Sequence, residues 1–143
     1  MRGPGNSAKV QYVRTMAWSV DGKLKPGILT LRLEGHIGDD DMSAFVNSHN
    51  RAIDAFAGTE YRVFCDVREL KPLSPSGTAL FEKAKAYSAQ HPNFQGSAVL
   101  VSSSIISMQH RRTSVSSGVM ETELITDDEA ACTAHLARVK RIG

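Results

Sequence analysis

The sequence predicts a single α/β domain with a five-stranded mixed sheet and four helices. Apolar runs of strand length alternate along the chain with longer segments of helical periodicity. At 143 residues the chain fits one domain and can bury a full core without disulfides or metal. Its composition, with 41% hydrophobic and 22% charged residues, is that of an ordinary globular protein.

The first part of the chain predicts an antiparallel pair of strands. Residues 1–8 are rich in Gly, Pro, Asn and Ser, so we expect a disordered start and a domain that spans 9–143. Alternation of apolar and polar residues over 16–20 and 28–33 predicts two strands. Asp21-Gly22 between them is a tight-turn signal.

Helices and strands then alternate to the end of the chain. An acidic run at 39–41 favours a helix start, and an apolar stripe continues that helix to about Ala57. A capping box formed by Thr126 and Glu129 predicts a last helix that extends to Val139. The elements between them are strands over 61–67, 96–101 and 119–125 and helices over 75–90 and 104–115. The predicted order is therefore ββαβαβαβα, with a mostly parallel sheet.

The stretch 61–77 is the first candidate for a functional site. Its apolar strand reaches Asp66 and Arg68, and Ser74 and Pro75 then provide a helix N-cap and a first helical position. Open α/β folds bind ligands and partners where strands pass into helices.

The element order, the strand-ending Asp66, the small apolar strand SAVLV and the acidic start of the last helix resemble STAS domains. The STAS family includes sulfate transporters and anti-sigma-factor antagonists, and the closer likeness is to its compact bacterial forms, which are grouped with SEC14-type lipid-binding folds. The resemblance covers nearly the whole chain after about Val10.

In the antagonists, a loop ending in Asp-Ser-Ser-Gly carries a serine that a partner kinase phosphorylates. By spacing, Ser76 and Gly77 match that serine and glycine, whereas Ser74 replaces the Asp and Pro75 replaces the first Ser. The resemblance implies a phosphorylatable binding module. The alternative is an ordinary helix N-terminus capped by Ser74.

The strongest basic cluster is His110, Arg111 and Arg112. It predicts either a cationic patch for an anion or a protein partner or simply a solvated helix face. The formal charge of +2 does not favour nucleic-acid binding. Cys65 and Cys132 are expected to be free, buried thiols.

Several classes of chemistry lack their usual motifs. His and Cys spacings of a zinc site, phosphate-binding glycine loops and a GxSxG elbow do not occur, so we expect no metal, no cofactor and no catalytic activity. No apolar run is long enough for a membrane helix, and the first residues do not form a signal peptide, which predicts a cytoplasmic protein.

The sequence thus predicts a non-catalytic regulatory or protein-interaction module. Its expected contact surface is the loop 70–77 with the second helix and the start of the third. The expected partner is a protein, such as a kinase or an anti-sigma-type regulator, or a second copy in a homodimer. The alternative is a module that binds a small apolar molecule or lipid in a sizeable pocket. An enzyme would require Asp66, Arg68, His110 or Arg111 to meet in one cleft.

Overall fold

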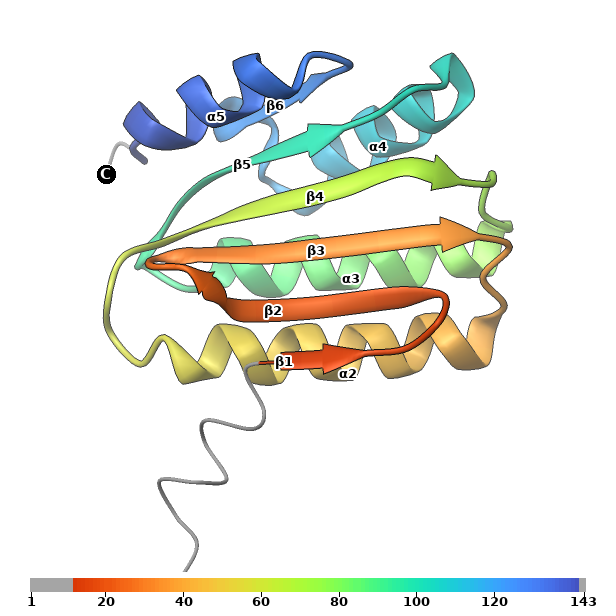
Figure 1. The fold of residues 1–143 in the computed structure, drawn as a ribbon, viewed down its shortest axis with the longest axis horizontal. Helices are drawn as coiled ribbons and strands as arrows, with labels where there is room; N and C mark the ends of the chain where they lie inside the picture. The colour runs from red at the N-terminus through yellow and green to blue at the C-terminus, as the bar shows by residue number, and fades with distance from the viewer. Residues whose placement is uncertain (1–11, 142–143) are drawn as a thin grey trace, which may run out of the picture.

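A computed structural model describes residues 12–141, which form a mixed sheet with helices on both faces (Figure 1). Strands β1 to β6 are neighbours in chain order; β1, β2 and β3 pair antiparallel, and β3 to β6 pair in parallel. The strands are β1 Tyr12–Arg14, β2 Trp18–Lys25, β3 Ile28–Gly35, β4 Tyr61–Leu70, β5 Phe94–Leu100 and β6 Glu123–Thr126. The helices are α2 Asp39–Ala55, α3 Pro75–Gln90, α4 Ser104–Ser117 and α5 Glu129–Arg138, with a short 3-10 helix η1 at Met120–Thr122.

The α/β class, the mixed sheet and the four helices are confirmed within residues 12–141, but the predicted strand number and order are wrong. The sheet has six strands because β1 precedes the predicted pair, with Val13 opposite Val20. Thr15 closes this hairpin, since its Oγ1 accepts hydrogen bonds from the backbone N–H groups of Ala17 and Trp18.

The predicted turn at Asp21-Gly22 is also wrong. Strand β2 continues through these residues with a register shift, and Asp21 Oδ1 accepts the N–H groups of Lys23 and Leu24 where the strand bulges. The chain reverses at Gly27 instead, which has a φ of +73° that glycine adopts without steric cost.

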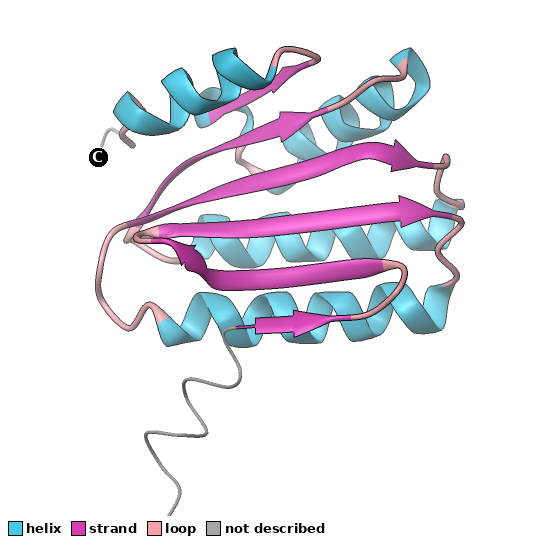
Figure 2. Cartoon of the chain, in the orientation of Figure 1, coloured by secondary structure: helices cyan, strands magenta, loops and turns pink. Residues whose placement is uncertain are grey.

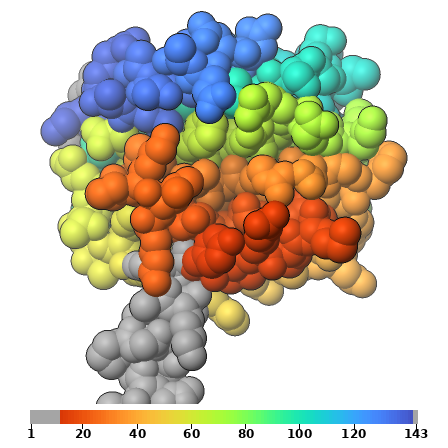
Figure 3. Space-filling model, viewed as in Figure 1, coloured from red at the N-terminus to blue at the C-terminus, as the bar shows by residue number. Residues whose placement is uncertain are grey.

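Two layers of different extent cover the sheet. Helices α2, α3 and α4 lie on one face and enclose the main core, while α5 lies on the other face near β5 and β6 (Figures 1 and 2). Beneath α5 is a smaller apolar cluster that includes Leu100, Cys132 and Leu136. In Figure 3 the red and orange atoms of β1 and β2 are visible on this second face, where no helix of residues 12–141 lies over them.

The two cysteines are confirmed as free and buried. Cys65 belongs to the main core and Cys132 to the cluster under α5, so the sheet separates them. Within residues 12–141, no helix has both the length and the apolar character that a membrane crossing requires.

Helix ends follow local chemistry, with two departures from prediction. Ser74 caps α3 as predicted, since its Oγ accepts the N–H of Gly77. Asp128, not Thr126, caps α5, because its Oδ1 accepts the N–H groups of Ala130 and Ala131. The predicted strand over 119–125 begins only at Glu123, since η1 occupies its first half.

Candidate functional site

Three helix starts meet at one edge of the sheet. Strands β3, β4 and β5 are parallel and lead into α2, α3 and α4, so their carboxyl ends and the helix N-termini lie along the same edge (Figure 1). This edge contains the predicted loop 70–77.

Ser76 lies exposed in the first turn of α3 and contacts the start of α2. Its Oγ donates a hydrogen bond of 2.7 Å to Asp39 Oδ2 and lies 3.2 Å from Ser74 Oγ. Gly77 is buried against the cap, and a Cβ at this position would lie 3.2 Å from Ser74 Oγ. The structure therefore places Ser74, Ser76 and Gly77 together at the junction of two helix N-termini.

Hydrogen bonds of the backbone and of a glutamine side chain hold the loop in position. Leu73 N–H donates to Gln109 Oε1 at 3.1 Å, and Gln109 Nε2 donates to the Leu73 carbonyl at 3.0 Å. Lys71 N–H donates to the Gly35 carbonyl at 3.1 Å. The loop is therefore attached to α4 on one side and to the end of β3 on the other.

Asp66 and Arg68 lie on the other face of the sheet. The Arg68 guanidinium donates to both Asp66 carboxylate oxygens, at 3.0 and 2.7 Å, and its Nη1 lies 3.7 Å from Glu129 Oε1 on α5. Burial acts to raise the pKa of Asp66, but the hydrogen bonds from Arg68 outweigh burial, and the pKa is lowered. Arg68 is thus engaged with Asp66 and α5 and does not turn towards Ser76.

His110 is not part of a surface patch, although its two neighbours are exposed. Its ring lies in the core with its centroid 4.8 Å from that of Phe81, and neither ring nitrogen has a hydrogen-bond partner among the described residues. Burial lowers the pKa of His110 well below 6.5, and nearby Lys85 acts in the same direction. Only Arg111 and Arg112 of the predicted cluster face solvent.

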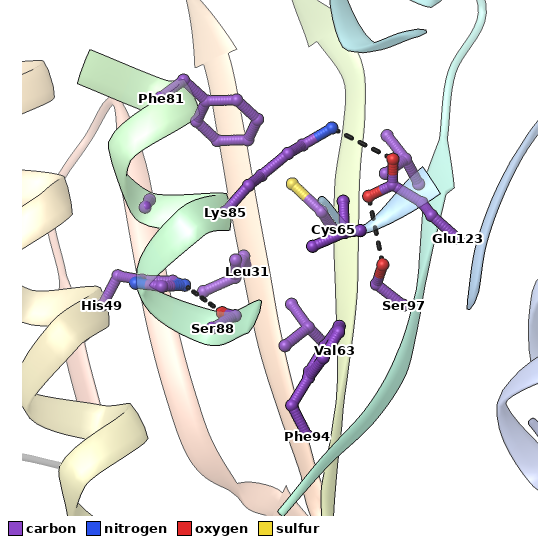
Figure 4. Close-up of a pocket in the computed structure, with 13 residues that line it drawn as sticks. Leu31, His49, Val63, Cys65, Phe81, Lys85, Ser88, Phe94, Ser97 and Glu123 are labelled. Atoms are coloured by element: carbon purple, nitrogen blue, oxygen red, sulfur yellow. Dashed lines mark hydrogen bonds and ion pairs between the residues drawn. The ribbon is translucent and has the colours of Figure 1, made fainter. Parts of the chain in front are cut away.

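A buried ion pair between α3 and β6 was not predicted. Lys85 Nζ lies 3.1 Å from Glu123 Oε1, and their side chains are only 8% and 3% exposed. Lys85 also donates to Ser114 Oγ at 2.9 Å and to the His110 carbonyl at 3.2 Å, both on α4. Figure 4 shows the pair, with the Ser97 hydroxyl donating to Glu123 Oε2 at 3.1 Å.

The sequence signal for this pair is that two elements each carry a charged residue at an inward-facing position. Lys85 follows Phe81 by four residues on the apolar stripe of α3, and Glu123 shares the inward face of its strand with Ile125. Nothing local shows that these two charges, 38 residues apart, meet in the fold.

The space beside the ion pair is small. A cavity of about 30 Å³ is lined by Cys65, Ser88, His49 and apolar side chains, as well as by the pair itself (Figure 4). That volume holds about one water molecule. Burial lowers the pKa of Lys85, although Glu123 opposes this shift. The arrangement joins α3, α4 and β6 and leaves no room for an organic substrate.

The predicted site residues therefore do not form one catalytic cleft. Asp66 and Arg68 lie on the α5 side of the sheet, His110 is buried, and Arg111 is on the surface of α4. Within residues 12–141, no three His, Cys, Asp or Glu side chains are grouped in a way that could hold a metal ion.

The fold and these sites define an α/β protein with a six-stranded mixed sheet and a loop shared between helix starts. Comparison with known proteins found no protein family that matches the chain and no curated protein of significant similarity.

Proposed function

We propose that this protein is a non-catalytic, STAS-like regulatory module that binds a protein partner at the edge formed by the loop 70–77, α3 and the start of α4. The observation that carries the proposal is the exposed Ser76 hydroxyl, which joins the first turn of α3 to Asp39 of α2. A surface held between three elements and centred on a modifiable hydroxyl suits a switchable contact better than it suits catalysis.

A phosphate at Ser76 would change this edge in a defined way. It would add a charge of about −1.5 to −2 and remove the donor that satisfies Asp39. The N-termini of α2 and α3 attract the phosphate, whereas Asp39 and its neighbours Asp40 and Asp41 repel it. The contact between α2 and α3 is therefore where a phosphorylated form would differ.

Four proteins test this proposal: wild type, Ser76→Ala, Ser76→Glu and Thr133→Glu. Each is immobilised and incubated with extract of the source organism, and bound proteins are quantified by mass spectrometry. A specific partner should be retained by wild type and Ser76→Ala and lost with Ser76→Glu. Thr133→Glu, which adds the same charge on exposed α5, should retain it.

Two results of this experiment count against the proposal. Equal partner recovery and equal elution volume in size-exclusion chromatography for all four proteins would remove the phosphorylation switch. Equal loss with Thr133→Glu would show that added charge, wherever it lies, is responsible.

A second candidate function is the binding of a small apolar molecule or lipid. Its specific observation is a groove of about 330 Å³ on the face that α5 partly covers, lined by Leu24, Ile28, Phe64, Leu136 and Ala137 and by four polar or charged residues. The core cavity is too small for such a ligand. Native mass spectrometry of the purified protein tests this candidate, because a bound lipid adds a discrete mass that Phe64→Asp should abolish.

A further inference from the structure

The outer face of α4 exposes large apolar side chains. Ile105, Met108 and Val115 are between 54% and 62% exposed, and Met120 in the following turn is 56% exposed. The first three have helical spacings of three and seven residues, so they form one stripe. The opposite face of the helix is buried through Ile106 and the residues near it. Helix α4 therefore has a second apolar face that no described element covers.

The part of this face that α4 forms is cationic, whereas Glu121 is exposed beside Met120. Arg111 and Arg112 are exposed, and neither forms an ion pair with any residue of the described range. No acidic residue occurs between Ser104 and Ser117. Unpaired arginines beside exposed apolar groups are the composition that binding surfaces favour.

A recess next to the stripe provides a place for an anchoring side chain. It has a volume of about 300 Å³ and is lined by Arg111, Val115, Met120 and Ile125 together with Ser114 and Glu123. Methionine adapts its shape to a partner at little cost, so Met108 and Met120 suit a contact that forms on binding.

The charge of this face distinguishes between the partners that could bind it. Two copies that paired antiparallel through α4 would bring four arginines near the symmetry axis, with no acid on either helix to balance them. An anionic membrane would gain only about 1 kcal/mol for each arginine, and the stripe has no Trp, Phe or Tyr to insert. A partner segment with acidic residues beside an apolar stripe matches both the apolar side chains and the two arginines of this surface.

We infer that the outer face of α4 binds an acidic amphipathic helix of a partner protein. Apolar residues of that helix pack on Ile105, Met108 and Val115, one side chain enters the recess at Met120, and carboxylates pair with Arg111 and Arg112. The inference rests on the proposed protein-interaction function; its surface shares the start of α4 with the loop surface but does not include Ser76.

Synthetic peptides serve as probes for this surface. The first is a fluorescein-labelled helix of about 18 residues with leucine at every third or fourth position and glutamate beside each leucine. The second replaces each glutamate by lysine, and the third scrambles the first so that its stripe is lost. Fluorescence anisotropy measures the affinity of each peptide for the full chain.

Wild type should bind the acidic amphipathic peptide at least about tenfold more tightly than either control peptide. Met108→Ser and Arg112→Glu should each weaken this binding by about tenfold. Met16→Ser removes an exposed methionine from the turn between β1 and β2 and should leave the affinity unchanged. The double variant Arg111→Glu/Arg112→Glu should prefer the lysine peptide. Circular dichroism verifies that all variants are folded.

Equal affinity for the three peptides, or equal loss of affinity with Met16→Ser, would overturn the inference. So would a wild-type dimer in light scattering that Met108→Ser dissociates, which indicates a second copy. Sedimentation with vesicles of phosphatidylcholine and phosphatidylserine that depends on Met108 would assign the face to a membrane instead. If the peptides fail to distinguish the variants but Ser76→Glu still loses its partner, only the α4 surface is rejected. If the peptides behave as expected but Ser76→Glu keeps its partner, only the loop proposal is rejected.

Discussion

Replacing Lys85 by methionine tests whether the buried ion pair holds the α3–α4–β6 junction together. The substitution keeps a side chain of similar length but leaves the Glu123 carboxylate, 3% exposed, without its cation. Breaking a buried pair by removing one partner costs about 3–5 kcal/mol. Glu123→Leu leaves the ammonium group without its carboxylate, and we expect a loss of unfolding free energy in the same range.

The double variant Lys85→Met/Glu123→Leu should be more stable than the sum of the single changes implies. The losses of unfolding free energy in the two single variants add to about 6–10 kcal/mol, but the double variant removes both charges together. Both the Ser97 and the Ser114 hydroxyls lose Glu123 as acceptor, but Ser114 still donates to the His110 carbonyl at 2.7 Å, so the remaining cost is mainly that of Ser97, about 1–3 kcal/mol. The coupling energy between the two positions is therefore at least about 3 kcal/mol, at the upper end of measured pairs.

Urea unfolding followed by circular dichroism gives the four free energies of this cycle. Lys83→Met, at an exposed position of the same helix, and Glu121→Leu, exposed near the same strand, are matched controls that should stay within about 0.5 kcal/mol of wild type. If the single variants lose less than about 1 kcal/mol, or if the losses simply add, the ion pair does not have the role that its burial and geometry indicate.

Two further predictions concern stability. Burial lowers the pKa of His49 from 6.5 to about 4, so the unfolded chain binds a proton that the folded chain does not, and stability falls as the pH drops through this range. The loss of unfolding free energy should reach about 3 kcal/mol near pH 4, and the unfolding free energy of His49→Gln should depend less steeply on pH. Urea unfolding at several pH values measures both proteins, and equal slopes of unfolding free energy against pH would refute the prediction. Gly96→Ala should destabilise the fold by more than about 2 kcal/mol, because a Cβ would lie 2.7 Å from both Val139 methyl carbons at a φ of +158°. A thermal unfolding midpoint equal to that of wild type would contradict that close approach.

The parts of the fold that the sequence predicted well are those with strong local signals. The Ser74-Pro75 start of α3 was predicted because the cap and the first helical position are adjacent in sequence. Strand β1 was missed because three residues with little alternation form a strand only when β2 pairs with them. Asp21-Gly22 looked like a turn, yet a bulge satisfies Asp21 within a continuous strand.

The candidate site was predicted only in part for a similar reason. The grouping of Ser74, Ser76 and Gly77 is local, whereas the contact of Ser76 with Asp39 joins residues 37 apart. His110 was grouped with two arginines by adjacency, although its helical spacing from Ile106 and Thr113 already favours the buried face. The Lys85–Glu123 pair depends on how α3 packs against β6, and a single sequence carries no direct signal for that packing.

The two proposed surfaces share a rigid support. Helix α3 begins at the Ser76 edge and is fixed to α4 by Lys85, which donates to the His110 carbonyl and to Ser114. Ser76 and Lys85 are nine residues apart, about 14 Å along a helix, so a charge added at Ser76 acts first on Asp39. The loop also contacts α4 directly, because Leu73 and Gln109 exchange two hydrogen bonds. Because Ile105, Met108 and Val115 are exposed and make none of these hydrogen bonds, binding at the loop and binding on the outer face of α4 should respond to different substitutions. That separation is the physical reason to treat them as two contacts of one module and not as a single extended site.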